Sequence, residues 1–138
     1  MIIDAKDMIL GRLCSQVSKK LLMGEKVDVI NCEECAVTGN KSAILNEYIT
    51  RLHRKAPTKG PFFYKRPDFF VKRAIRGMLP FKHSRGREAF KNLKCHIGVP
   101  ESLKDDKIFD IKIGNIDKLH EVHYLKVKDI CRAVGGKI

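Results

Sequence analysis

Long apolar runs are missing from this 138-residue sequence. No stretch approaches the roughly 18 to 20 consecutive apolar residues that a membrane-spanning helix needs. The N-terminus, Met1–Asp4, lacks the basic and apolar regions of a secretory signal. The 5 cysteines are an odd number and lie mostly among apolar residues, as reduced thiols do in a cytosolic protein. We therefore expect a soluble cytoplasmic protein that has no membrane partner.

The glycine patterns of nucleotide-binding enzymes are missing too. Gly11-Arg12 and Gly39-Asn40-Lys41 each follow a predicted strand region, but neither extends to G-x-G-x-x-G or to G-x-x-x-x-G-K-[ST]. None of the 5 histidines lies in G-x-S-x-G or a comparable nucleophile motif. We predict no catalytic residues and no small-molecule substrate, although an enzyme whose catalytic residues meet only in space stays open.

A complete set of metal ligands is also missing. Cys32-Glu33-Glu34-Cys35 is a single CxxC without a second pair, and His120 and His123 lie too far along the chain for zinc-finger spacing. The two intervening glutamates are expected to raise the pKa of the thiols, which disfavours redox chemistry. The sequence H-E-V-H at 120–123 is one residue short of the H-E-x-x-H motif. We predict no metal and no cofactor, only strand-end and loop cysteines and two surface histidines.

Acidic residues are nearly absent from residues 51–94, which we call the basic segment. This segment contains Asp68 and Glu88 against fourteen Lys and Arg, so its net charge is +12, equal to that of the whole chain. The fourteen cations are Arg51, Arg54, Lys55, Lys59, Lys65, Arg66, Lys72, Arg73, Arg76, Lys82, Arg85, Arg87, Lys91 and Lys94. Like charges at this density repel one another unless an anion neutralises them, which predicts a polyanionic partner.

Strand and helix patterns alternate along the chain, and residues 1–138 are predicted to form a single domain. Ile2-Ile3 and Val27–Ile30 are typical of buried strands, and the helical spacing of apolar residues between them ends at Gly24. This order predicts a right-handed parallel crossover. Further helices are predicted at residues 44–52, 67–78, 85–93 and 127–134, and a further strand at 95–97. Residues 101–125 show no clear pattern. The alternation predicts an α/β fold with a mostly parallel sheet.

The basic segment is expected to carry its cations on two helices and two loops. The helix that begins at Pro67 has its cations on one side and an apolar face on the other. That apolar face consists of Val71, Ala74, Ile75 and Met78. The loop over residues 54–66 interleaves cations with three aromatic residues, Phe62, Phe63 and Tyr64. Cations that neutralise phosphates beside aromatics that stack on unpaired bases favour a structured RNA as the partner. The sequence leaves open whether these rings contact RNA or anchor the loop.

Several short stretches of the sequence, inside and outside the basic segment, match those of a known protein family. The chain resembles the universal large-subunit ribosomal protein family numbered thirteen over about residues 1–100. The matching stretches are Ile3-Asp4-Ala5, Leu10-Gly11-Arg12-Leu13-Cys14-Ser15, Ile30-Asn31-Cys32-Glu33, Val37-Thr38-Gly39-Asn40, Ile75-Arg76-Gly77-Met78-Leu79-Pro80, Arg85-Gly86-Arg87, and Leu93-Lys94 through Gly98-Val99-Pro100. Cysteine replaces the family's small or apolar residue at Cys14, Cys32 and Cys35, and the tail over 101–138 is variable. The compact length and the Gly-Gly-Lys ending resemble the archaeal or eukaryotic branch, and the length favours the archaeal one.

The resemblance implies a three-layer α/β/α fold around a four-stranded, mostly parallel sheet. It also implies a structural, non-catalytic constituent of the large ribosomal subunit that binds large-subunit rRNA early in assembly, beside neighbouring ribosomal proteins in the cytoplasm. The resemblance and the charge map together predict the RNA-binding residues Gly39, Asn40, Lys41, Arg54, Lys55, Lys59, Lys65, Arg66, Lys72, Arg73, Arg76, Lys82, His83, Arg85, Arg87 and Lys91. Two alternatives stay open: an RNA- or nucleotide-modifying enzyme on the same scaffold, because the ends of parallel strands often hold ligands, and a zinc-stabilised binding module.

Overall fold

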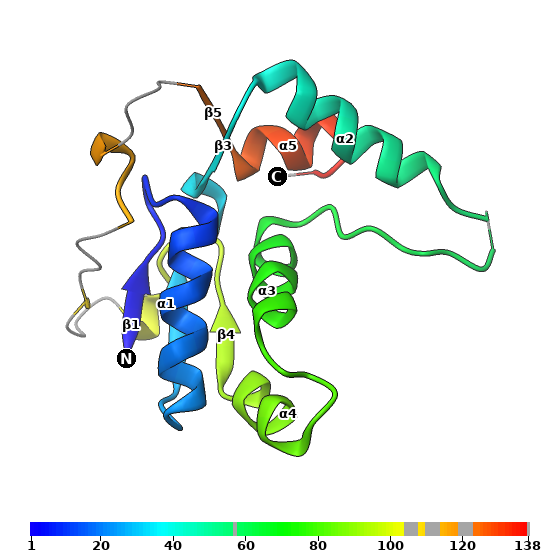
Figure 1. Cartoon of the computed structure of the whole chain (residues 1–138). Coiled ribbons are helices and arrows are strands. Elements are labelled where there is room, and N and C mark those ends of the chain that lie inside the picture. The colour runs from blue at the N-terminus through cyan, green and yellow to red at the C-terminus, as the bar shows by residue number, and fades with distance from the viewer. Residues whose placement is uncertain (57, 104–107, 110–113, 119–122, 138) are drawn as a thin grey trace.

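Three parallel strands lie at the centre of the computed structural model, which describes residues 1–56, 58–103, 108–109, 114–118 and 123–137. The strands β1 (Ile2–Asp4), β2 (Val27–Ile30) and β4 (Leu93–Cys95) run in the order β1-β2-β4. Their apolar side chains are almost completely buried, as expected where both faces of a parallel sheet are covered. The buried strands are therefore the scaffold on which the helices are placed (Figure 1).

Three helices pack against this sheet and against one another. They are α1 (Leu10–Leu22), α3 (Pro67–Met78) and α4 (Ser84–Lys91). The buried side of α1 includes Leu13 and Val17, at the helical spacing that the sequence predicts. Buried side chains of α3 join them in one apolar cluster. The packing fixes α3 against the sheet, and the opposite side of α3 is free to carry charge.

The remaining elements extend the fold around the C-terminus. α2 (Lys41–His53) packs on α5 (Val127–Ala133), and Figure 1 shows the loop that follows α2 returning along the outside of the molecule to α3. Short 3₁₀ turns occur at Cys32–Glu34 (η1), Glu101–Leu103 (η2) and Ile116–Lys118 (η3). The mixed α/β fold with a parallel sheet is confirmed, and its layers are consistent with the three-layer arrangement. No helix in the described part of the chain is long and apolar enough to cross a membrane.

The sheet differs from the prediction in its number of strands. Within the described residues it has three strands rather than four, and Ile108 meets the free edge of β1 only as an isolated parallel bridge to Ile2. A separate antiparallel pair joins β3 (Ala36–Thr38) to β5 (Tyr124–Lys126), where the sequence indicated a connection and an unpatterned stretch. Both strands have 3 residues and no run of Ile and Val like those in β1 and β2, so only their long-range pairing reveals them.

Two smaller predictions, in the basic segment and just after it, are wrong. The strand predicted at 95–97 is β4, Leu93–Cys95, because Leu93 pairs with Val27 and is buried, whereas Ile97 is 42% exposed. Met78 is not part of the buried face of α3, since it is 45% exposed. The helix ends there, and the following residue, Leu79, occupies the buried position.

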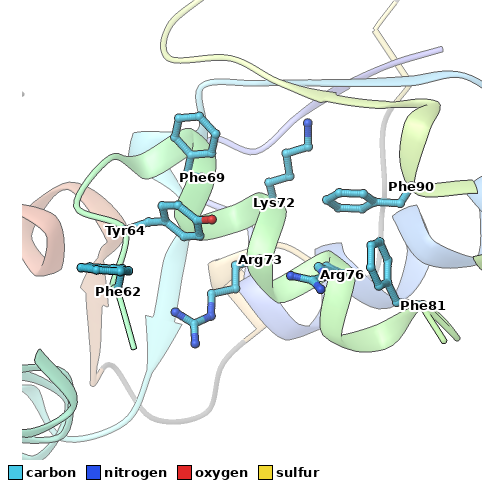
Figure 2. A pocket seen from close by; sticks show the side chains of 8 residues that line it. All are labelled: Phe62, Tyr64, Phe69, Lys72, Arg73, Arg76, Phe81 and Phe90. Carbon is cyan, nitrogen blue, oxygen red and sulfur yellow. The ribbon is translucent and has the colours of Figure 1, made fainter. Parts of the chain in front are cut away.

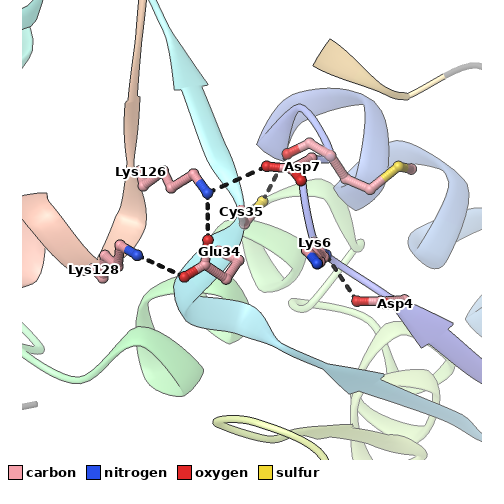
Figure 3. Close-up of polar contacts among 8 residues, drawn as sticks. Asp4, Lys6, Asp7, Glu34, Cys35, Lys126 and Lys128 are labelled. Atoms are coloured by element: carbon pink, nitrogen blue, oxygen red, sulfur yellow. Dashed lines mark hydrogen bonds and ion pairs between the residues drawn. The ribbon is translucent and has the colours of Figure 1, made fainter. Parts of the chain in front are cut away.

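A lysine clamp on Glu34 joins the C-terminal elements to the sheet (Figure 3). Lys128 donates to one carboxylate oxygen of Glu34 at 2.7 Å, and Lys126 contacts the other oxygen and lies 3.3 Å from Asp7. Hydrogen bonds from the two lysines lower the pKa of Glu34 to about 2. Since Glu34 is on η1 and the lysines are on β5 and α5, the clamp stabilises the docking of the tail.

This clamp predicts a loss of stability in acid. The pKa of Glu34 is lower in the folded chain than its ordinary value of 4.5, so its contribution is fully present above about pH 4.5 and disappears as the pH falls toward 2. We expect Glu34→Gln to lower the free energy of unfolding at pH 7 by about 1 to 2 kcal/mol and to flatten its dependence on pH between these values. Urea unfolding at several pH values measures both. Glu88→Gln, which removes an exposed carboxylate from α4, is the matched control, and an equal effect of the two substitutions would contradict the clamp.

Candidate nucleic-acid interface

Helix α3 presents its cations to solvent because its other side is anchored in the core. Pro67 occupies the start of the helix and Asp68 its first turn, which suits the positive end of the helix dipole. Val71 and Ile75 are completely buried. Arg73 and Arg76 are exposed on the other side, and Lys72 is half-buried. The charged face that the sequence predicts on this helix is therefore confirmed.

An open groove of about 520 Å³ lies along this face of α3 (Figure 2). It is lined by Phe62, Tyr64, Phe69, Lys72, Arg73, Arg76, Phe81 and Phe90. Among the described residues that line it are three cations and five aromatic rings, but no acid. In Figure 2 the rings stand on two sides, Phe62, Tyr64 and Phe69 on one and Phe81 and Phe90 on the other, with the cations of α3 between them. We call this feature the α3 groove.

Cation–π contacts hold the charged side chains of the α3 groove in place. The guanidinium carbon of Arg76 lies 4.1 Å from the ring centre of Phe81, and the ammonium of Lys72 lies 5.3 Å from that of Phe90. The two rings themselves meet edge to face at 5.4 Å. A cation that is already ordered loses less conformational freedom when it binds a phosphate. The groove is therefore preorganised for an anion.

The structure divides the three aromatic residues of the preceding loop by role. Phe63 packs against Tyr48 and Phe70 with ring centres 5.7 and 6.3 Å away, and so anchors the loop to α2 and α3. Phe62 is 66% exposed and Tyr64 is 49% exposed. The anchoring role that the sequence left open therefore belongs to Phe63, while Phe62 and Tyr64 keep much of their surface exposed, and their contact with RNA stays a prediction.

A close backbone approach at Gly86 fixes the turn that brings Phe81 to the groove. A Cβ atom at Gly86 would lie 2.1 Å from the carbonyl oxygen of Pro80 and 3.0 Å from the backbone nitrogen of Phe81. The His83 backbone N–H donates to that same Pro80 oxygen at 3.0 Å. Only glycine allows α4 and this turn to pack so closely, so Gly86 sets the position of Phe81 and of the neighbouring cation Lys82.

Two of the predicted RNA-binding arginines also donate hydrogen bonds within the protein. The guanidinium of Arg85 donates to the carbonyl oxygen of Leu22 at 3.3 Å, which ties α4 to the C-terminal end of α1. The guanidinium of Arg66 donates to Asp68 at 2.8 Å and lies over the ring of Phe69. Arg66 and Arg85 are therefore partly used for structure.

Cations of the basic segment also line other hollows outside the α3 groove. Arg54 and Arg73 share one of about 300 Å³, which also includes Arg51, a residue that the predicted binding set leaves out. Lys55 and Lys65 share another of about 440 Å³. The remaining predicted contacts of the segment are exposed: Lys59, Lys82, His83, Arg87 and Lys91. Exposure makes RNA contact possible, and the contacts themselves stay predictions.

Gly39, Asn40 and Lys41 lie at the other end of α2 from the loop that begins at Arg54. Gly39 has φ near +130°, and its N–H donates to the carbonyl of His123 at 2.9 Å. The side chain of Asn40 caps the helix by accepting from the N–H of Ser42 at 3.1 Å. A helix of 13 residues is about 20 Å long, so the structure does not bring these residues into the α3 groove. Two of the three have a local structural role.

The sequence prediction missed three rings of the groove: Phe69, Phe81 and Phe90. Phe69 is 41% exposed, and its position off the apolar stripe of α3 was the one available signal. Phe81 and Phe90 are nine residues apart and meet only because of the turn at Gly86. No spacing rule predicts such a contact.

The cysteines of the CxxC motif are buried thiols. Sγ of Cys35 donates to the carbonyl of Met8 at 3.2 Å, and burial raises the pKa of this thiol to about 12. A hydrogen bond with Cys95, together with burial, raises the pKa of Cys32. Both thiols are protonated at neutral pH, and burial rather than the two glutamates is the main cause for Cys35. Among the described residues no three His, Cys, Asp or Glu side chains form a cluster that would hold a metal ion; His120 lies outside them.

Comparison with known proteins places the chain in one family. A family model described as Ribosomal protein L13 matches residues 1–102. The protein named large ribosomal subunit protein uL13 of Methanopyrus kandleri is 40% identical over 136 residues, which cover 97% of this chain and 86% of that protein. The protein of the same name from Methanosarcina barkeri is 40% identical over 137 residues, covering 99% and 98%. That of Methanocaldococcus jannaschii is 39% identical over 140 residues, also covering 99% and 98%. The variable tail is thus matched by the relatives, although the family model ends before it.

Proposed function

Because this chain belongs to the ribosomal protein L13 family, we propose that it is a structural constituent of the large ribosomal subunit and binds large-subunit rRNA through the basic segment. The observation that carries the RNA claim is the face of α3, where exposed cations and aromatic rings surround a groove without any acid among its described lining residues. Phosphates neutralise such cations and release counterions, which favours binding.

The proposed RNA surface includes the cations of the predicted RNA-binding set, which omits Arg51 and Lys94 of the basic segment. The α3 groove forms its centre, and the hollows that contain Arg54 and Lys65 extend it toward the preceding loop. Gly39, Asn40 and Lys41 would contact RNA at a second place, because α2 separates them from the groove. A surface of this extent suits recognition of a folded RNA by its shape and backbone.

The rest of the chain supports this role. We propose that residues 1–138 act as one non-catalytic domain in the cytoplasm, where the basic segment binds rRNA early in subunit assembly. The neutral remainder, in which cations and acids cancel, is then available for neighbouring ribosomal proteins. The names of the relatives support the ribosomal role, and no observation favours the RNA-modifying enzyme.

The dependence of binding on salt tests the RNA claim. The full-length chain is mixed with a large-subunit rRNA fragment from an archaeal relative, and the affinity is measured by filter binding between about 50 and 200 mM salt. We expect the logarithm of the association constant to fall with the logarithm of the salt concentration with a slope of several units, since each phosphate contact contributes about 0.7 to 0.9. A flat dependence on salt, or no binding, would overturn the proposed function.

A further inference from the structure

Exposed aromatic rings form one wall of the α3 groove. Phe62, Tyr64 and Phe69 are 66%, 49% and 41% exposed. Tyr64 and Phe69 stack with ring centres 5.3 Å apart and an interplanar angle of 21°, so each holds the other in a fixed orientation. Exposed apolar surface gathered in one place marks a binding site rather than a random feature of a soluble protein. A partner that only neutralised charge would leave this wall uncovered.

The positive charges of the α3 groove restrict which kind of partner can bind against the aromatic wall. Lys72, Arg73 and Arg76 project between the two groups of rings, and no acid is among the described residues that line the groove (Figure 2). The partner must therefore offer a flat apolar face and negative charge within the same small space. A nucleotide has both, because its base stacks on an aromatic ring while its phosphate binds a lysine or arginine.

The rings require that the nucleotide be unpaired. In an A-form duplex the faces of the bases are covered by their neighbours, so exposed rings on a protein cannot stack on them. Bulges, loops and single strands leave bases free to leave the stack. The groove, of about 520 Å³, is within the range of protein sites that hold molecules of nucleotide size.

We propose that the α3 groove binds an extruded, unpaired RNA base, which stacks on Tyr64 or Phe62 while the cations of α3 hold its flanking phosphates. This rests on the proposed rRNA-binding function and deepens it, since it identifies the RNA element as a bulge or loop rather than a continuous duplex. The groove is then the part of the interface that recognises RNA structure, and the surrounding cations supply affinity for any phosphate backbone.

Two hairpin RNAs with the same stem test the proposal on the full-length chain. One hairpin is fully paired, and the other carries a three-nucleotide bulge with 2-aminopurine at its centre. We expect the bulged hairpin to bind at least about tenfold more tightly, and the fluorescence of 2-aminopurine to be quenched when its base stacks. The double variant Phe62→Leu/Tyr64→Leu should lose most of this preference and the quenching, with the salt slope unchanged because no charge is removed.

A matched control is available on another surface. Phe109 is 44% exposed and has Lys20 5.2 Å from its ring centre, at the edge of β1 rather than in the groove. Phe109→Leu should leave the preference for the bulge unchanged. Circular dichroism is the check that both variants are folded, which is expected for substitutions of exposed rings.

The outcomes separate this proposal from the one on which it rests. Steep salt dependence with equal binding of the two hairpins, or an unchanged preference in the Phe62→Leu/Tyr64→Leu variant, would overturn the base site and leave rRNA binding intact. If neither hairpin bound with an affinity that falls steeply as the salt concentration rises, both proposals would be overturned.

Discussion

Replacing Arg73, Arg76 and Lys82 together by glutamine is expected to weaken binding of an rRNA fragment about 100- to 500-fold at 0.1 M salt. Each phosphate contact contributes about 0.7 to 0.9 to the slope of log affinity against log salt, so three contacts account for about two to nearly three units. All three side chains are exposed, and two of them line the α3 groove. The affinities of the variant and the wild type should converge as the salt concentration approaches 1 M. Filter binding over a salt series measures the slope and the affinity together.

The control for this variant removes the same charge from the neutral remainder of the chain. Lys6, Lys19 and Lys26 are exposed and lie outside the basic segment. Their joint replacement by glutamine should change the slope by less than about half a unit, because they make no phosphate contact in the proposed interface. If both triple variants lost affinity equally, net charge rather than the face of α3 would be responsible for binding.

The helices were predictable because their signals are local. The apolar spacing that ends at Gly24 gave α1, and the Pro67-Asp68 pair gave the start of α3. Both signals lie within one helix and depend only on the geometry of the helix itself. The ends of the helices were predicted less well. Met78 is the last residue of α3 but is exposed, whereas the next residue, Leu79, is buried.

The sheet was only partly predictable because pairing is not local. β1 and β2 were predicted from their runs of Ile and Val. Such runs are present because these strands are buried on both faces of the sheet. β3 and β5 are 3 residues each and pair across a long stretch of sequence, with Thr38 beside Tyr124. Because they have no run of Ile and Val such as β1 has, nothing within these two strands distinguishes them from a loop. The fourth strand came from the family resemblance, and the described residues contain only the Ile2–Ile108 bridge in that place.

The charge of the candidate site was predictable, but its shape was not. The excess of cations in residues 51–94 is a property of composition and needs no coordinates. Which rings face solvent depends on how the loop after α2 packs, and that packing uses Phe63 while leaving Phe62 and Tyr64 exposed. The second wall of the groove depends on the turn that Gly86 permits. The site therefore combines a compositional signal with contacts that only the folded chain defines.

Substitution of Gly86 by alanine is expected to destabilise the protein although alanine is the better helix former. The added methyl group would lie 2.1 Å from the carbonyl oxygen of Pro80, a backbone atom that cannot move aside as a side-chain end can. We expect a loss of about 1 to 3 kcal/mol in the free energy of unfolding, measured by urea titration. Because the turn must shift, Phe81 and Lys82 move as well, and the affinity for the bulged hairpin should fall.

Gly77 is the matched control, because it is also a helical glycine of the basic segment. It lies in α3, its φ is not in the left-handed region, and a Cβ there would meet nothing within 4 Å. Gly77→Ala should therefore leave the stability unchanged or raise it by up to about 1 kcal/mol, the ordinary gain in helix propensity. The two substitutions are expected to change the free energy of unfolding in opposite directions. Comparing them therefore separates the effect of the close approach at Pro80 from the effect of helix propensity. If Gly86→Ala stabilised the chain as Gly77→Ala does, the turn would not depend on that approach, and the placement of Phe81 against Phe90 would need another cause.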